Sequence, residues 1–138
     1  SLDELVGVED GFDLVHSQVV FQHIPWRMGR RLLRDLAKSV APHGVMAVHL
    51  LARSIAPRSA RLITKLRYAV PPLHWLWNAS KGRPIFEPAM QMHPYPISEV
   101  IAELENAGLS QFYLSVGLTE DNAFVEVMLY ACGPKAFG

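Results

Sequence analysis

Apolar and polar positions follow two different periods along the first half of the chain. Residues 12–17 (FDLVHS) and 45–51 (VMAVHLL) form short apolar runs, which are typical of parallel strands covered by helices on both faces. Between these runs, apolar side chains recur at helical spacing: Met28, Leu32, Leu33, Leu36, Ala37 and Val40. The pattern predicts a strand, a helix stopped by Pro42, and a second strand, because a proline ring cannot continue the helical hydrogen-bond ladder.

The second half of the chain predicts a further helix and two strands. Ser98 is placed to cap a helix that begins near residue 97. Gly108 is placed to end that helix in a left-handed conformation, with Leu109 folding back onto its last turn. Residues 112–117 and 124–132 are typical of a strand hairpin. Because hairpin strands are antiparallel and strands joined by crossover helices are parallel, we expect an α/β fold whose parallel sheet ends in one antiparallel strand.

A long excursion, residues 53–95, interrupts this order. It begins with a helical stripe of apolar residues beside a row of cations, which predicts a helix that Pro71-Pro72 would end. A short aromatic segment at residues 73–77 and a proline-rich loop follow. We expect this segment to be a helical cap inserted within a single domain that spans residues 1–138.

Composition limits the class of protein. A chain of 138 residues that is 50% hydrophobic can bury one core but not two. With 19% charged residues and zero formal net charge, disorder is not expected. The single cysteine, Cys132, excludes an internal disulfide and fits a reducing compartment, so we expect a cytoplasmic protein. Its uncharged stretches are shorter than the roughly 18 to 20 apolar residues that span a bilayer, and its acidic start lacks the basic region of a signal peptide.

The neutral total hides a strong segregation of charge. Twelve of the thirteen Lys and Arg residues lie between Arg27 and Arg83, where Asp35 is the only acid, so this segment is formally +11. The first thirteen residues carry five acids and no base. The chain therefore has an acidic head, a basic middle and an acidic-leaning tail.

Several motifs together resemble the C-terminal half of a class I S-adenosylmethionine-dependent methyltransferase. Phe12-Asp13-Leu14-Val15 is similar to the fourth strand of that family, and Gln22-His23-Ile24 to the loop after it. Pro42-His43-Gly44 is similar to the Pro-Gly-Gly that opens the fifth strand, with Gly44 keeping a flexible turn. The resemblance implies a partial Rossmann-like sheet made of the family's strands 4, 5, 6 and 7, the last antiparallel, with a helical cap after strand 5.

The same resemblance implies S-adenosylmethionine as cofactor and a small-molecule methyl acceptor. Ligands of open α/β sheets bind beyond the carboxyl ends of the strands. The implied cofactor contacts are therefore Ser17, Gln18, Gln22 and His23. His23 is also the candidate general base, since imidazole titrates near neutral pH, although in this family the corresponding His more often packs beneath the cofactor loop.

The family's first half carries a Gly-x-Gly loop and an acidic strand end that hold the cofactor, and the chain shows neither. We therefore expect it to be inactive alone. With one cysteine and no His-x-x-x-His pair, no metal site is expected. If the strand at residues 12–17 lacks the neighbour that the family's first strand supplies, its apolar edge exposes unpaired backbone groups. We then expect the chain to form a homodimer through that edge or its exposed apolar face, to aggregate, or to be the ordered part of a longer protein.

The excursion supplies the candidate substrate-binding residues: Arg58, Arg61, Lys65, Tyr68, Trp75 and Trp77. Cations beside aromatic rings suit an anionic or aromatic substrate, and they equally suit an anionic membrane surface. The third interpretation is that the cations form a solvated surface and the tryptophans belong to the core of the cap, with no binding role. Nucleic acid is not an expected partner, because no nucleic-acid-binding module is visible. A non-catalytic interaction or membrane-surface module built on half of the fold is the alternative function.

Overall fold

A computed structural model describes residues 11–82, 84 and 92–136 of the chain. These residues group into two compact units. The first is built from the segments up to Ser54 and from Met92 onward, and the second from Ile55–Gln91. The second unit falls inside the predicted cap, residues 53–95. Of the acidic head, the first thirteen residues, only residues 11–13 belong to the described part of the chain.

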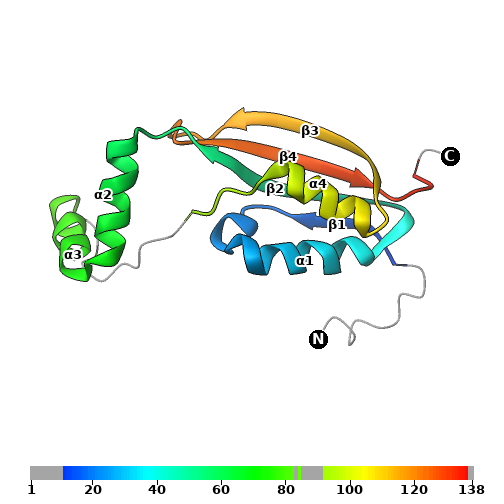
Figure 1. Ribbon diagram of the computed structural model, residues 1–138, viewed down its shortest axis with the longest axis horizontal. Helices are drawn as coiled ribbons and strands as arrows, with labels where there is room; N and C mark the ends of the chain where they lie inside the picture. The colour runs from blue at the N-terminus through cyan, green and yellow to red at the C-terminus, as the bar shows by residue number, and fades with distance from the viewer. Residues whose placement is uncertain (1–10, 83, 85–91, 137–138) are drawn as a thin grey trace. The chain divides into compact units, whose positions relative to one another are not determined.

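The first unit holds a four-stranded mixed sheet (Figure 1). Its strands are β1 (Phe12–Ser17), β2 (Val40–Ser54), β3 (Ser110–Leu118) and β4 (Phe124–Cys132), in the spatial order β1-β2-β4-β3. β1 and β2 are parallel, while β4 is antiparallel to both of its neighbours. The predicted α/β class, with a parallel sheet and one antiparallel strand, is therefore confirmed.

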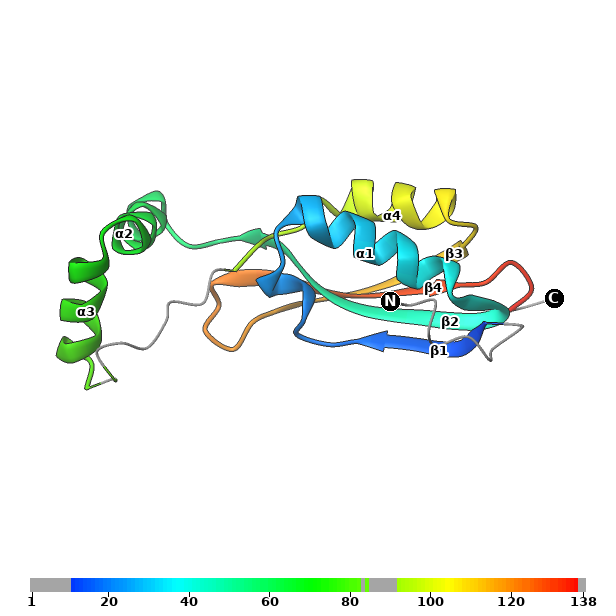
Figure 2. The ribbon, with the colours of Figure 1, turned by 90° about the horizontal axis from the view of Figure 1, so that it is seen from below.

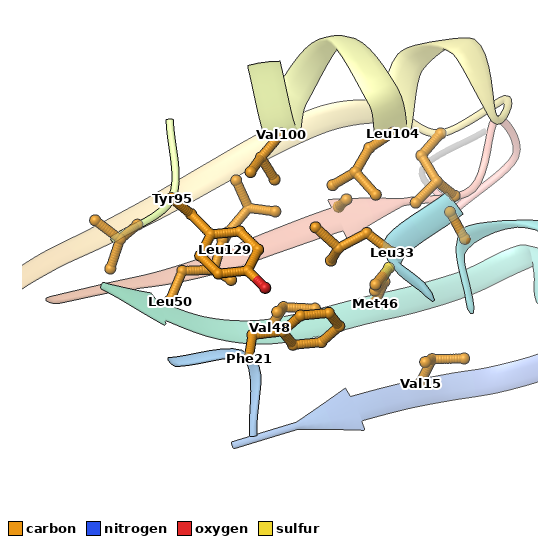
Figure 3. Close-up of a cluster of buried hydrophobic side chains, with 14 residues drawn as sticks. Val15, Phe21, Leu33, Met46, Val48, Leu50, Tyr95, Val100, Leu104 and Leu129 are labelled. Carbon is orange, nitrogen blue, oxygen red and sulfur yellow. The ribbon is translucent and has the colours of Figure 1, made fainter. Parts of the chain in front are cut away.

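Two helices, α1 (Trp26–Lys38) and α4 (Ile97–Asn106), lie on the same side of this sheet (Figure 2). The core fills the space between them and the strands (Figure 3). Its largest fully buried side chains are Tyr95, Phe21, Leu33, Met46, Leu50, Leu104 and Leu129.

The prediction that β1 is covered on both faces is wrong for the described residues. Val15 faces the helices and is buried, whereas Leu14 points to the other side and is 63% exposed. β1 also forms one end of the described sheet, with β2 as its strand neighbour. The apolar edge that the sequence predicted is therefore present in the described part of the chain.

β2 starts earlier than the apolar run at residues 45–51 indicated. Phe12 pairs with Val40, but Leu14 pairs with Val45, so residues 41–44 bulge out of the ladder between β1 and β2. A bulge leaves a residue without a ladder hydrogen bond. The strand can therefore pass through this stretch and begin directly after α1.

The bulge explains why two predictions about this stretch are wrong. α1 ends at Lys38, four residues before Pro42. Pro42 lies inside β2, in a bulge, which is one of the strand positions that tolerate a missing N–H. Gly44 forms no flexible turn. A Cβ at Gly44 would lie 2.5 Å from the Phe12 carbonyl oxygen, so glycine is needed there for close approach of two strands.

The ends of α4 agree with the sequence in part. The helix begins at Ile97 after Pro96, so Ser98 lies within its first turn and does not cap it. At the other end, Gly108 has a φ of +101° and Leu109 donates its backbone N–H to the Leu104 carbonyl, 3.0 Å away. The predicted left-handed termination is therefore confirmed, and Leu109 is buried as its hydrophobic contact.

The second unit contains two helices, α2 (Arg58–Ala69) and α3 (Pro71–Ser80). The first agrees with the predicted helix. The aromatic segment at residues 73–77 was not predicted to be helical, yet it lies within α3. Pro71 and Pro72 occupy the first turn of α3, where a missing N–H costs nothing, so the same prolines end one helix and begin the next.

An ion pair joins the two helices of the first unit. Glu103 of α4 is only 6% exposed, and its carboxylate accepts hydrogen bonds from Arg34 Nη2 at 2.5 Å and from Arg30 Nε at 2.6 Å. The bond from Arg34, with the charge of both guanidinium groups, lowers the pKa of Glu103 against the opposing effect of burial. α1 and α4 are thus held together by a carboxylate that must stay ionised.

Gly29 of α1 makes room for the Tyr95 ring. A Cβ built at Gly29 would lie 1.9 Å from the Tyr95 hydroxyl oxygen, and the ring is fully buried, so it cannot move aside. We expect Gly29→Ala to lower the free energy of unfolding by about 1 to 3 kcal/mol in urea denaturation. Helix propensity alone would raise it by about 1 kcal/mol, so a loss must come from the clash.

The matched control is Gly117→Ala in β3, where the new Cβ would lie 3.4 Å from Glu126 Oε1 in an exposed strand. We expect that variant to change stability by less than about 0.5 kcal/mol. Equal stability of the two variants would show that Gly29 is not a packing requirement.

The lowered pKa of Glu103 makes the free energy of unfolding depend on pH. Because the folded pKa lies below the unfolded one, the stabilisation is present above the unfolded pKa and is lost as pH falls through the folded pKa. We expect Glu103→Gln to lower the melting temperature at neutral pH and to flatten its fall in acid. Glu105→Gln, an exposed change on the same helix, is the control. A parallel fall in both variants would contradict the coupling.

Candidate functional site

The candidate site is the loop that leaves the carboxyl end of β1. Its backbone is strained at Val19, which has a φ of +63°. Left-handed geometry is a true outlier for a β-branched side chain and costs about 1 to 2 kcal/mol. Such strain gathers at functional sites, where the surrounding structure forces it.

Aromatic side chains in the core anchor the loop. Phe21, in a short 3-10 turn (η2, Phe21–His23), is fully buried, and its ring meets Tyr95 edge to face at 6.0 Å. Trp26 meets the same Tyr95 ring at 5.4 Å. The Tyr95 hydroxyl donates to the Ile24 carbonyl at 2.8 Å, and burial raises the pKa of Tyr95 to about 12, so this donor keeps its proton.

Two backbone hydrogen bonds hold the segment that returns from the second unit, one to the loop and one to β2. His93 N–H donates to the Gln22 carbonyl at 2.8 Å, and Tyr95 N–H donates to the Leu51 carbonyl at 2.6 Å. The returning segment therefore lies across both the loop and the end of β2. With its inner side chains and backbone fixed in this way, the loop presents its remaining side chains from a rigid base.

The four predicted cofactor contacts differ in their surroundings. Gln18 and His23 are exposed, and Ser17 is partly buried at the end of β1. Gln22 is 7% exposed, and its Nε2 lies 3.1 Å from His23 Nε2. The fold thus brings all four onto one loop, with Gln18 and His23 the more accessible to a ligand and Gln22 placed to orient the His23 ring.

The predicted substrate-binding residues belong to the second unit. Arg58, Arg61, Lys65 and Tyr68 lie on α2, and Trp75 and Trp77 lie on α3. Lys65 is exposed, and both indole side chains are 41% exposed. The side chains of Arg58, Arg61 and Tyr68 lie outside what the structure describes. The sequence-predicted residues therefore divide into a loop set and a helical set.

The residues described here contain no group of three or more His, Cys, Asp or Glu side chains that could hold a metal ion. None of the helices in the described ranges is both long and apolar enough to cross a membrane. The chemistry open to the loop is that of hydrogen-bonding side chains and one accessible imidazole beside apolar Val19 and Val20.

Sequence reasoning missed Val19 and Tyr95. Nothing in a Val-Val pair signals a left-handed residue, because β-branched side chains disfavour that geometry, yet Val19 lies between β1 and the buried Phe21 with a positive φ. Tyr95 stands between two prolines, Pro94 and Pro96, in what looked like loop. An aromatic residue fixed by flanking prolines was the signal that could have indicated a buried anchor.

No family model and no curated protein sequence matches this chain. Among solved structures it resembles a protein described as a possible exported protein from Bordetella parapertussis, at a TM-score of 0.51 and 20% identity, over 91% of this chain and 40% of that one. It also resembles an O-methyltransferase family protein from Burkholderia thailandensis, at a TM-score of 0.46 and 15% identity, over 94% of this chain and 32% of that one. The first similarity shows a shared fold, and the chain spans about two fifths and about a third of the length of these two proteins.

The strain at Val19 leads to a stability prediction. Val19→Gly should raise the free energy of unfolding by up to about 1 kcal/mol, because glycine adopts positive φ freely and the relief exceeds its entropic cost. Val20→Gly, next in the chain at a φ of −87°, is the control and should lower it by about 0.5 to 1 kcal/mol. Urea denaturation measures both. Equal losses in the two variants would mean that Val19 is unstrained.

Proposed function

We propose that this chain is the C-terminal part of an S-adenosylmethionine-dependent methyltransferase that acts on a small-molecule acceptor. The observation that carries the proposal is the strand order β1-β2-β4-β3, with β4 antiparallel between two strands that run in the same direction. The family that the sequence resembles ends its sheet in this way, whereas nicotinamide-binding Rossmann domains normally end in a parallel strand. The motifs around Phe12-Asp13 and Gln22-His23 support the same proposal.

The residues of the loop fit part of such a cofactor. Ser17 and Gln18 offer a hydroxyl and an amide at the carboxyl end of β1, where ligands of open sheets bind. Exposed Val19 and Val20 offer apolar surface beside them. This set suits the polar and apolar portions of an amino-acid moiety. It includes no carboxylate that would hold a ribose and no glycine-rich turn, so we place those contacts in a preceding segment.

When bound, S-adenosylmethionine supplies an electrophilic methyl group on a positively charged sulfur. The protein then has mainly to position the acceptor in line with the methyl group and to exclude water, because the positive charge on sulfur disappears during the transfer. In this proposal the Phe21 and Tyr95 anchor keeps the loop from shifting, and the strained backbone at Val19 directs Gln18 outward. A rigid loop of this kind suits a reaction that depends on alignment.

His23 is the side chain best placed to remove a proton from the acceptor. Its ring is exposed and lies beside the Gln22 amide, which can hold one ring nitrogen through Nε2. An acceptor hydroxyl or amine that loses its proton at the moment of attack becomes a better nucleophile, and a positioned base typically contributes 10²- to 10⁴-fold. His23 therefore carries the catalytic role in the proposal, and Gln22 positions it.

Calorimetric titration of S-adenosylhomocysteine tests the cofactor assignment. We expect no micromolar binding to the 138-residue chain, because half of the contacts are assigned elsewhere, and micromolar binding to a longer protein that includes the preceding segment. Within that protein, Gln18→Ala should weaken binding several-fold. Tight binding to the bare chain would overturn the division of the site between two segments.

His23→Ala in the longer protein tests the base. We expect turnover to fall roughly 100-fold, while the free energy of unfolding changes by less than about 0.5 kcal/mol. His43→Ala is the matched control, since His43 is an exposed histidine in the bulge near the start of β2. An unchanged rate in His23→Ala would leave His23 as a packing residue.

A further inference from the structure

The second unit exposes an unusual share of apolar surface. Among the described residues, 18 large hydrophobic side chains are exposed, and nine of these lie between Ile55 and Trp77. Asn78 is the one residue of Ile55–Gln91 that is buried in the described part of that unit, and it is polar. α2 and α3 contact each other, yet their apolar side chains form no buried core among the described residues.

These exposed side chains are ordered along two helix faces. On α2, Leu62 and Leu66 lie one turn apart and are 67% and 52% exposed. On α3, Leu73, Leu76 and Trp77 share the i, i+3, i+4 spacing that brings side chains together on a helix. Leu76 is 70% exposed. Apolar stripes on adjacent short helices are large enough to mark an interaction surface rather than scattered exposure.

The charge of the same segment favours a negatively charged partner. Residues 55–86 carry six Lys or Arg and no Asp or Glu, so any surface that covers them must tolerate or supply negative charge. α3 itself has no charged residue from Pro71 to Ser80. An uncharged apolar helix beside cations is poorly suited to water and well suited to the boundary between lipid chains and headgroups.

Trp77 and Lys81 place an aromatic ring and a cation side by side, the combination that suits the lipid–headgroup boundary. The Lys81 ammonium nitrogen lies 5.5 Å from the centroid of the Trp77 ring. Indole rings concentrate at the headgroup level of membranes, and a lysine beside such a ring reaches the anionic phosphates above it. The pair therefore has the apolar and cationic parts needed for an interfacial contact.

We propose that α2 and α3 dock on the surface of an anionic phospholipid bilayer, with Leu62, Leu66 and Leu76 entering the interface. Lys65 and Lys81 lie among its headgroups. This inference does not rest on methyl transfer. Vesicle binding can succeed or fail independently of S-adenosylhomocysteine binding.

Sedimentation of the 138-residue chain with lipid vesicles tests the proposal. We expect binding to vesicles that contain phosphatidylserine, little binding to pure phosphatidylcholine, and weaker binding as salt is added. In a Trp26→Phe background, which leaves Trp75 and Trp77 as the reporters, indole emission should shift to shorter wavelength on binding. Equal binding to both kinds of vesicle, or to neither, would overturn the proposal.

Two variants separate the apolar and cationic contributions. Leu62→Ser with Leu76→Ser should reduce binding at least tenfold, because both exposed leucines lose their place in the interface. Lys65→Glu with Lys81→Glu should reduce it by at least about fivefold for each cation removed. Arg27→Glu with Arg31→Glu, an equal charge change at exposed positions of α1, is the control and should bind as the parent chain does. Circular dichroism checks that all three variants are folded.

A different occupant would give different results. If a second copy covers α2 and α3, the chain will sediment as a dimer without lipid, and Leu62→Ser with Leu76→Ser will make it a monomer. If the control variant loses as much vesicle binding as the Lys65 and Lys81 variant, attraction is non-specific. Either result would overturn bilayer docking through this unit.

Discussion

The buried ring of Tyr95 is the contact on which the first unit depends most. It touches three segments that are distant in sequence: the loop after β1 through Phe21, the start of α1 through Trp26 and Gly29, and the end of β2 through its own backbone N–H. Its hydroxyl meets the Ile24 carbonyl, so the ring is buried with its one polar atom paired. Burial keeps that hydroxyl protonated well above neutral pH, since it raises the pKa of Tyr95 to about 12. One side chain thereby fixes the loop on which the proposed chemistry depends.

The ion pair between α1 and α4 adds a second long-range contact to the first unit. Both helices lie on one face, and the Glu103 carboxylate bridges Arg30 and Arg34 there. A nearly buried carboxylate would be costly without these two partners, but with them it fixes the helices side by side. Packing and charge thus reinforce each other on the covered face, while Leu14 on the other face keeps most of its surface exposed.

The sequence predicted the fold better than it predicted the site. The strand and helix order, the antiparallel final strand and the left-handed Gly108 follow from local patterns, and local patterns are strong where apolar periodicity and glycine placement agree. The bulge around Pro42 could not be foreseen, because it depends on the pairing of β1 with a strand that begins immediately after α1. The packing of Tyr95 against the loop joins residues more than seventy positions apart, so the local sequence around Phe21 does not indicate it. Long-range contacts of this kind leave little trace in a single sequence.

The hydrogen bond from the Tyr95 N–H to the Leu51 carbonyl also brings together the two ends of the excursion between β2 and α4. The chain leaves the sheet after Ser54, forms α2 and α3, and returns to β2 at Leu51. The entropic cost of closing such an excursion grows slowly, by about 0.6 kcal/mol for each doubling of its length. The sheet can therefore accept a shorter, longer or wholly different segment here with little loss of stability. This junction is a point at which the second unit is free to diverge in length and sequence while the loop after β1 keeps its shape.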